Sequence, residues 1–348
     1  GAGRPDIAYA IERLVDYCAH EHGFDPIALR RKNFIAPSAM PYQTANAGAY
    51  DSGDFEAVMD DALAQADWQG FEARRQEAAK RGKLRGIGIA TYPEAGGGGA
   101  APKDEVSVEF AADGSMTLFA VTQSSGQGHE TTFPQIVARM LGIDASAIRF
   151  HPMPPPADLV GNGTGGSRGV LGTGSAFHIL GEKLIERARP PAARLLGRPE
   201  AELRYAEGAF HAGDRSIGFL DLARQLAGEQ PHPVDMAADG VFGMSYPNGC
   251  HIAEVEIDPE TGETAVLRYT AVDDLGNVIN PVLVEGQVQG GVMQGAGQVF
   301  GEHAKYDEAT GQLLAGSFMD YVMPRAGWIP HMLVHGHPVP TPTNGLAA

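Results

Sequence analysis

The spacing of apolar residues along the chain predicts a mixture of helices and strands. Apolar residues that recur every three or four positions predict helices over 5–22, 55–66, 132–142, 173–188, 219–226 and 281–302. Apolar runs bounded by turn residues predict strands over 84–91 and 148–150, hairpins over 106–121 and 203–210, and a long strand pair over 250–274. Because strands and helices do not alternate regularly, we expect an α+β fold with mixed sheets and packed helices.

Two of these segments carry further expectations. In the first predicted helix, Ile7, Ile11, Leu14 and Cys18 share one face, and we expect Cys18 to lie in the core. Residues 70–83 are strongly charged, which is typical of a solvated helix face, and they mark a domain boundary. The sequence therefore predicts a mainly helical part before residue 83 and a strand-rich part after it.

A glycine-rich junction at residues 124–132 stands between a strand-like run and a predicted helix. Gly126 and Gly128 flank Gln127 there. Glycines at such a junction let the backbone approach a ligand and direct free N–H groups and the helix dipole at an anion. The alternative is a tight turn with an ordinary polar cap, and these residues alone do not separate the two interpretations.

Two further stretches have the same character. They cover residues 161–168, which read Gly-Asn-Gly-Thr-Gly-Gly-Ser-Arg, and residues 285–295, which contain Gln287. All three junctions are rich in Gly, Gln or Ser and poor in positive charge. Together they predict that the chain holds one polar cofactor through backbone and amide groups.

Composition narrows the class of partner. The chain has 348 residues and a net charge of −17, which speaks against nucleic acid or an anionic membrane as partner. The two cysteines, Cys18 and Cys250, form no disulfide framework or zinc motif, so a reducing cytoplasm is expected. The opening residues have no initiator Met and resemble the interior of a loop, which suggests a piece of a longer chain.

Separated motifs along the whole chain resemble the molybdenum-binding subunit of the xanthine dehydrogenase family of molybdopterin hydroxylases, including the aldehyde oxidase and carbon monoxide dehydrogenase branches. The motifs occur in family order: Gly-Ala-Gly-Arg-Pro at 1–5, Ile-Ala-Leu-Arg-Arg-Lys-Asn-Phe-Ile at 27–35, Gly-Gln-Gly-His-Glu-Thr at 126–131, Thr-Gly-Gly-Ser-Arg at 164–168, Pro-Asn-Gly-Cys-His at 247–251, Asp-Asp-Leu-Gly at 273–276, Ile-Asn-Pro at 279–281 and Glu-Gly-Gln-Val at 285–288.

The resemblance implies two domains and a set of partners. Residues 1–82 correspond to the C-terminal part of the first molybdenum-cofactor-binding domain, and residues 83–348 to the second, without its C-terminal end. The implied cofactor is molybdopterin with molybdenum, in its cytosine dinucleotide form, and the metal is held through the pterin dithiolene rather than by protein ligands. Such enzymes hydroxylate an N-heterocycle or aldehyde with oxygen from water, and electrons pass through 2Fe–2S clusters to FAD on partner chains.

Individual residues acquire expected roles from the same resemblance. Gln127 matches a glutamine that hydrogen-bonds the cofactor near the metal, Gln287 matches a second one, and Arg168 is expected to pair with phosphate or, alternatively, with a surface acid. Ala2 stands where several family members carry an aromatic residue that sandwiches the substrate, and this loop lacks the cysteine of true carbon monoxide dehydrogenases. The expected cofactor-binding residues are Gly126, Gln127, Gly128, Gly165, Gly166, Ser167, Arg168 and Gln287, and the expected substrate loop is Gly1, Ala2, Gly3 and Arg4.

The resemblance leaves the catalytic base outside this chain. Family members continue past 340–344 to a glutamate that acts as general base, whereas this sequence stops at Ala348, so we expect the chain alone to be inactive. The alternative function is a non-catalytic cofactor-binding or assembly protein without that base. His129 is either a ligand-facing hydrogen bonder or a helix-terminal residue, His251 is expected to be structural, and Asp273 and Asp274 are expected to close a turn unless burial gives them proton chemistry.

Overall fold

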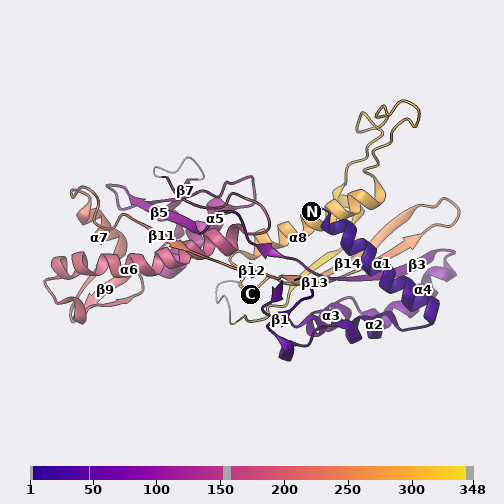
Figure 1. Ribbon diagram of the computed structural model, residues 1–348, viewed down its shortest axis with the longest axis horizontal. Coiled ribbons are helices and arrows are strands. Elements are labelled where there is room, and N and C mark those ends of the chain that lie inside the picture. Colours follow the sequence, from indigo (N-terminus) through magenta and orange to yellow (C-terminus); the bar gives the residue numbers. More distant parts are fainter. Residues whose placement is uncertain (1–2, 47, 152–157, 342–348) are drawn as a thin grey trace. The chain divides into compact units, whose positions relative to one another are not determined.

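The computed structural model describes residues 3–46, 48–151 and 158–341 of the chain. The chain forms two compact units (Figure 1). Unit 1 combines Gly1–Glu94 with Tyr246–Ala348, and unit 2 is the intervening segment Ala95–Ser245. The assignment of the two family domains to 1–82 and 83–348 stays a prediction.

Unit 1 is built on a four-stranded sheet in the order β15-β14-β13-β3. Strand β13 (Asn248–Ile257) pairs antiparallel with both β3 (Leu84–Pro93) and β14 (Thr264–Asp274), and β15 (Met332–Gly336) pairs parallel to β14. The predicted strand at 84–91 and the strand pair at 250–274 are thus present. Strand β15 was not predicted, because its five residues lie after a long irregular segment.

Helices cover both faces of this sheet. Val58, Met59 and Ala62 of α3 (Phe55–Gln65) pack against Ile252 and Val272, while Val292 and Ala296 of α8 (Pro281–Phe300) pack against Val266. Val255 joins the α8 cluster and Ile252 the α3 cluster, so residues of opposite parity on β13 point to opposite faces. Asp54 caps α3, since its carboxylate accepts from the Ala57 amide at 3.1 Å.

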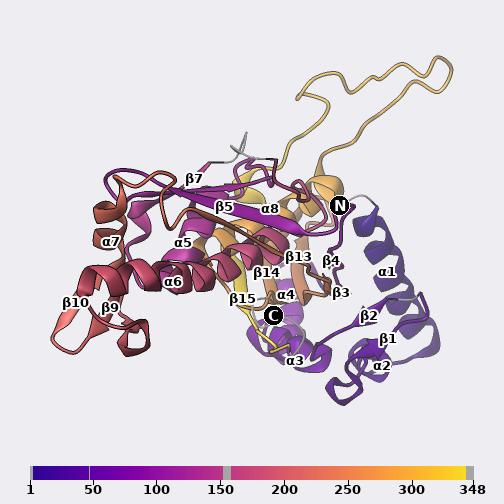
Figure 2. The ribbon, with the colours of Figure 1, turned by 60° about the vertical axis from the view of Figure 1, so that its left-hand side comes forward.

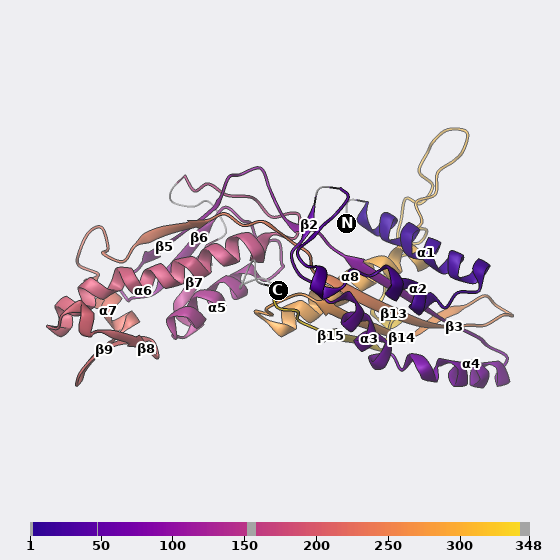
Figure 3. The ribbon, with the colours of Figure 1, turned by 60° about the horizontal axis from the view of Figure 1, so that its bottom comes forward.

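The remaining helices of unit 1 are α1 (Arg4–His22), α2 (Pro26–Asn33) and α4 (Phe71–Lys80), and Figure 3 shows α3 and α4 alongside the sheet strands. The predicted apolar face of α1 is not a core face, because Ile7, Ile11 and Leu14 are 62%, 55% and 60% exposed. Cys18 is only half-buried, so its expected core position is wrong. Instead the buried Arg30 fastens α1, with its guanidinium bonded to Glu12 at 2.6 Å and to Asp16 at 2.9 Å.

A buried carboxylate ties α4 to the same sheet. Glu254 on β13 is 2% exposed and accepts from Arg74 of α4 at 2.9 Å and from Arg85 of β3 at 2.6 Å. The other charged residues of α4, such as Glu72 and Arg75, are exposed, as predicted for a solvated face. Arg74 therefore connects the charged run to the sheet, and Arg81, just after α4, does the same through Glu256 of β13 at 2.7 Å.

Unit 2 contains a second four-stranded sheet in the order β11-β5-β6-β7. Strands β5 (Asp104–Phe110) and β6 (Met116–Ala120) form the predicted hairpin, β7 (Ile148–His151) runs parallel to β6, and β11 (Met236–Gly240) pairs with β5. Helices α5 (His129–Leu141) and α6 (Ser175–Leu196) pack side by side along this sheet (Figure 2). Phe133 of α5 and Phe177 of α6 are fully buried between them.

Helix α6 is longer than predicted. The sequence suggested an end near residue 188, before Pro190 and Pro191, but the helix continues to Leu196. Ala192 and Ala193 are buried, so packing outweighs the loss of N–H donors at the two prolines. A small sheet of β8 (Arg204–Ala206), β9 (Ala209–Ala212) and β10 (Arg215–Gly218), with α7 (Phe219–Leu226), completes the unit. The α+β class is confirmed.

Candidate functional site

Three loops of unit 2 are joined by hydrogen bonds into one polar cluster, which we call the glycine-loop cluster: residues 96–99, 122–128 and 161–169. The Gly97 amide donates to the Gly166 carbonyl at 3.0 Å, and the Thr164 hydroxyl donates to the Gln123 carbonyl. The buried Asn162 accepts from the Ala101 amide at 3.0 Å. The first two glycine-rich junctions predicted from the sequence therefore lie together.

The four consecutive glycines at 96–99 belong to this cluster but were not among the predicted site residues. The run of four glycines was the signal in the sequence that could have identified this loop as part of the site. Gly99 has φ +143°, and a Cβ there would collide with the side chains of Asn162 and Arg168. Only glycine fits this position, because the backbone must pass close to both side chains.

Arg168 fastens two of these loops to each other. Its Nε donates to the Gly165 carbonyl at 2.8 Å and its Nη1 to the Gly98 carbonyl at 3.0 Å. Neither bond is the phosphate contact or the ion pair considered from the sequence. In this structure the Arg168 guanidinium donates to carbonyl groups of the cluster. Binding of phosphate by Arg168 stays a prediction.

Gln127 is held inside its own loop. Its Oε1 accepts from the Ser125 amide at 2.6 Å, and its Nε2 donates to the Gln123 carbonyl at 3.1 Å. These bonds fix the orientation of the carboxamide. Gly126 beside it has φ +94°, and a Cβ placed there would meet nothing within 4 Å, so the backbone on this side is open to a ligand.

The second junction contains a backbone conformation that is unusual for its residue. Ser167 has φ +53°, in the left-handed region, and follows Gly166 at φ +61°. Left-handed backbone disfavours any residue with a Cβ and often occurs at binding sites. Ser167 is exposed, so its hydroxyl and backbone are accessible at the edge of the cluster.

Helix α5 begins at the cluster, one residue after Gly128. No side-chain cap satisfies its first amides, and N–H groups at a helix N-terminus attract negative charge. The Glu130 carboxylate lies in the same first turn and accepts from the Ser124 hydroxyl at 2.6 Å; this bond lowers its pKa, so the carboxylate is charged. The negative charge of Glu130 partly compensates the positive end of the helix dipole. The start of α5 therefore favours a neutral ring edge over an anion.

His129 occupies a buried position at this helix start. It is 4% exposed, stacks on Phe133 with 4.5 Å between ring centroids, and has a buried Nδ1 without a hydrogen-bond partner among the described residues. Burial lowers the pKa of its imidazole, which Glu130 and the Gln123 backbone offset only in part. A Cβ on Gly169 would lie 2.9 Å from Nε2, so His129 fills the space beneath the second junction.

The third junction lies in unit 1. Gln287 is exposed on α8, whose N-terminus is capped by Asn280 through a 3.2 Å bond to the Leu283 amide. Its convergence with the glycine-loop cluster stays a prediction.

The expected substrate loop is only partly described. Gly3 has φ +84° and caps α1, and Arg4 is paired with Glu94. Gly1 and Ala2 lie outside the described residues.

The acidic pair Asp273 and Asp274 ends strand β14, and Asp274 closes the turn that follows as expected, because its Oδ1 accepts from the Gly276 amide at 3.2 Å. Both are 1% exposed. The Asp273 carboxylate bonds to the His251 Nε2 at 3.0 Å and accepts from the Tyr92 hydroxyl at 2.8 Å. Burial raises the pKa of the Asp274 carboxyl, which accepts from Asn248 at 3.3 Å and from two backbone amides.

Comparison with known proteins identifies the family. The molybdopterin cofactor-binding domain model matches residues 61–330, which is well over half of the chain. The chain belongs to this family. The predicted resemblance to the xanthine dehydrogenase group is thereby confirmed, as is the expectation of a molybdopterin cofactor.

The chain is similar to the large subunits of known enzymes. It is 32% identical to the carbon monoxide dehydrogenase large chain of Hydrogenophaga pseudoflava, over 99% of this chain and 45% of the relative. It is 30% identical to the nicotine 6-hydroxylase large subunit of Paenarthrobacter nicotinovorans, over 93% and 42%. The chain therefore spans less than half the length of these relatives.

Solved structures agree with this placement. A Cu,Mo carbon monoxide dehydrogenase superimposes with a TM-score of 0.86 at 31% identity, covering 99% of this chain and 46% of that one. Quinoline 2-oxidoreductase from Pseudomonas putida 86 gives 0.84 at 28% identity, with 98% and 46% covered. Among the described residues no helix is long and apolar enough to cross a membrane, and no group of His, Cys, Asp or Glu is arranged to hold a metal ion.

The donor set of the glycine-loop cluster fits a pterin cofactor. Backbone amides, the carboxamide of Gln127 and the hydroxyl of Ser167 can hydrogen-bond a heterocyclic edge without adding charge. The open space beside Gly126 gives a ring access to the main chain. What the cluster lacks in the described residues is a free basic side chain, since Arg168 is engaged with carbonyl groups.

Proposed function

We propose that this chain supplies part of the molybdenum-cofactor site of a molybdopterin hydroxylase that hydroxylates an N-heterocycle or an aldehyde with oxygen from water. The observation that carries the proposal is the glycine-loop cluster, in which two junctions share hydrogen bonds and leave Gly126 open to a ligand. Gln287 of unit 1 contributes a further carboxamide to the same cofactor.

In this proposal the residues of the chain bind and orient. Gln127 presents a fixed carboxamide, the backbone of Gly126, Gly128, Gly165 and Gly166 allows close approach, and Ser167 adds a hydroxyl at the edge. Arg168 holds the loops in register through Nε and Nη1, and we propose that only its Nη2 binds phosphate. When bound, the cofactor supplies the metal chemistry of hydroxylation.

The complete enzyme is proposed to contain more than this chain. The cofactor is the cytosine dinucleotide form, and the partners are the rest of the molybdenum-binding subunit, a 2Fe–2S chain and an FAD chain, in the cytoplasm. The coverage of the carbon monoxide dehydrogenase large chain and of the nicotine 6-hydroxylase large subunit supports a longer molybdenum-binding subunit with partner subunits, whereas the cofactor form, the 2Fe–2S and FAD chains and the compartment rest on the sequence analysis alone. Metal and pterin analysis of protein purified from its native host, with mass spectrometry of the chains that co-purify, tests it.

Gln127→Ala in the assembled enzyme should lower activity and bound pterin at least tenfold, because the fixed carboxamide is lost, while the melting temperature changes by only about 2–4 °C. Gln123→Ala is the matched control, since Gln123 lies in the same loop, its side chain is exposed, and its backbone carbonyl accepts the bonds from Gln127 and Thr164. Activity and pterin content should survive that change. Equal losses of stability and activity in Gln127→Ala would assign Gln127 a structural role. Separately, a stable apo monomer that takes up free cofactor would favour the alternative function, a carrier or assembly protein.

A further inference from the structure

Helix α1 carries its apolar residues on an exposed side. These residues recur every three or four positions and share one face of the helix, which we call the outer face of α1: Ile7, Ala10, Ile11, Leu14, Tyr17 and Cys18. Ile7, Ile11 and Leu14 are each more than half exposed. Figure 2 shows α1 at the margin of unit 1. Most of the outer face therefore meets solvent in this structure.

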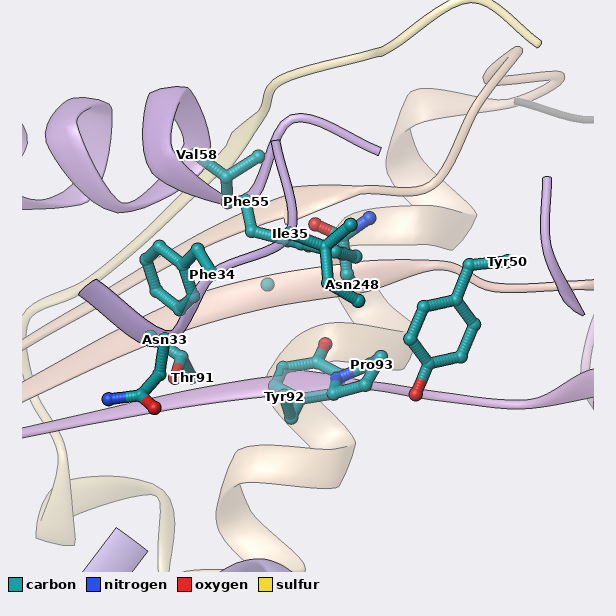
Figure 4. A pocket seen from close by; sticks show the side chains of 11 residues that line it. Asn33, Phe34, Ile35, Tyr50, Phe55, Val58, Thr91, Tyr92, Pro93 and Asn248 are labelled. Carbon is teal, nitrogen blue, oxygen red and sulfur yellow. The ribbon is translucent and has the colours of Figure 1, made fainter. Parts of the chain in front are cut away.

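The opposite side of α1 is polar and holds the helix in place. Glu12 and Asp16 bond to the buried Arg30 at 2.6 and 2.9 Å. Glu12 also accepts from the Thr91 hydroxyl of β3 at 2.8 Å, and Thr91 lies in the wall of a cavity of about 160 Å³ (Figure 4). Because Glu12 and Asp16 are about one turn apart, these bonds fix the rotation of α1 about its axis. The outer face cannot turn inward without breaking them.

The outer face suits a protein partner better than a membrane. Large exposed apolar patches mark interaction sites. Helices that lie on anionic membranes are rich in Lys and Arg on their polar side, whereas the polar side of α1 presents Glu12 and Asp16 to Arg30, and the chain has a net charge of −17. Positions 7, 11, 14 and 18 are separated by four, three and four residues, the spacing of a coiled-coil seam. This spacing favours a helix as the contacting element.

The relatives and the predicted domain division indicate which helix is available. The carbon monoxide dehydrogenase large chain of Hydrogenophaga pseudoflava matches 99% of this chain with 45% of its own length, so more than half of that large chain lies outside the match. Helix α1 lies before residue 61, where the matched cofactor-binding domain begins. In the division predicted from the sequence, α1 belongs to a first domain of which this chain holds only the C-terminal part. A domain packs around one core, so the remainder of that domain is expected to share its core with α1.

We propose that the outer face of α1 binds an apolar helix from the remaining part of the molybdenum-binding subunit. This inference rests on the proposed function, which assigns that remaining part to the same enzyme. The partner helix presents aliphatic or aromatic side chains at spacings of three and four residues. Its contact covers Leu14 near the middle of the face and closes Cys18 off from solvent.

Photo-cross-linking in the assembled enzyme tests the proposal. p-Benzoylphenylalanine introduced at Ile11 should cross-link to a peptide of the molybdenum-binding subunit from outside these 348 residues. Introduced at His20, which is exposed and off the outer face, it should give about tenfold less of that product. A cross-link from position 11 to a second copy of this chain, to an iron–sulfur or flavin chain, or to no protein would overturn the proposal. Molybdenum and pterin measured in the same preparation report on the proposed function, so the two can fail separately.

Alkylation of Cys18 by iodoacetamide measures cover of the same face in the assembled enzyme. Leu14→Glu places a charge in the contact, so Cys18 should react at least tenfold faster than in the wild type. His20→Glu adds the same carboxylate outside the face and should leave the rate unchanged. Cys250, which is buried, should stay unlabelled in each protein and reports that the chain is folded. Equal rates at Cys18 in the wild type and in folded Leu14→Glu would contradict the proposed contact.

Discussion

At the scale of single residues, the structure separates side chains that shape the glycine-loop cluster from those free to meet a ligand. Arg168 and Gln127 are bonded to neighbouring backbone groups, whereas Ser167 is exposed in a strained conformation. His129 lies beneath the cluster, where burial lowers the pKa of its imidazole. The observed bonds of Arg168 and Gln127 support the loops, and the expected contacts of both residues with the cofactor stay predictions.

The pKa of His129 gives a prediction for stability against pH. Because the folded pKa is depressed, its neutral form stabilises unit 2 fully above the unfolded value of about 6.5, and this contribution is lost as pH falls through the folded pKa. His129→Gln cannot gain a charge, so its unfolding free energy should fall less than that of the wild type between pH 7 and pH 5. Urea unfolding followed at both pH values measures this difference, and parallel losses would contradict it.

At the scale of elements, α1 differs most from its sequence expectation. Its apolar residues have helical spacing, but Ile7, Ile11 and Leu14 are exposed, and the helix is fastened through Arg30 and its acidic partners. Periodicity shows that a face is apolar but does not show what covers it. In α3 the same periodicity does face a sheet, and Val58 and Met59 are buried as the pattern suggests.

Leu14→Glu should therefore change the unfolding free energy of this chain by less than about 0.5 kcal/mol, because the side chain already contacts solvent. Met59→Ala, in the buried face of α3, is the contrasting variant and should cost about 2–5 kcal/mol. Denaturant titration of both variants compares them. A cost for Leu14→Glu that approaches that of Met59→Ala would mean that α1 packs on its apolar face.

Sequence patterns located the elements better than their ends or their roles. Helix α7 was predicted with its observed bounds, whereas α6 passes Pro190 and Pro191 because burial of the following alanines outweighs local propensity. The two junctions at 124–132 and 161–168 were found because glycine-rich composition is visible locally. The roles of Arg168 and Gly99 were not, since they depend on bonds between loops that are far apart in the sequence.

At the scale of the whole molecule, each unit has its own sheet and its own buried contacts. The Glu254 carboxylate belongs to unit 1 alone, where it neutralises Arg74 and Arg85. Its hydrogen bonds join α4, β3 and β13. Substitution of Glu254 should accordingly lower the stability of unit 1 and leave the sheet of unit 2 unchanged.

Glu254→Ala should destabilise unit 1 by about 2–3 kcal/mol, because the two partly buried guanidinium groups lose the charged hydrogen bonds of their shared carboxylate and keep only Asp67 and Glu256 as partners. Hydrogen exchange followed by mass spectrometry should show faster exchange in β3 and β13 and unchanged protection in β5 and β6. Glu72→Ala, which removes an exposed partner of Arg75, is the control and should alter neither unit. Loss of protection in both units would mean that they unfold together.

The neighbouring strands β3 and β13 meet at Pro93 and Asn248, although the whole of unit 2 separates them along the chain. During synthesis at about 5–20 residues per second, β3 leaves the ribosome roughly ten seconds or more before its partner exists. During this interval the backbone N–H and C=O groups of β3 that later bond to β13 are unpaired and can form non-native strand pairs. In unit 2 the β5–β6 hairpin has a short connection and can form during this interval, whereas β11, which also pairs with β5, is made only shortly before β13.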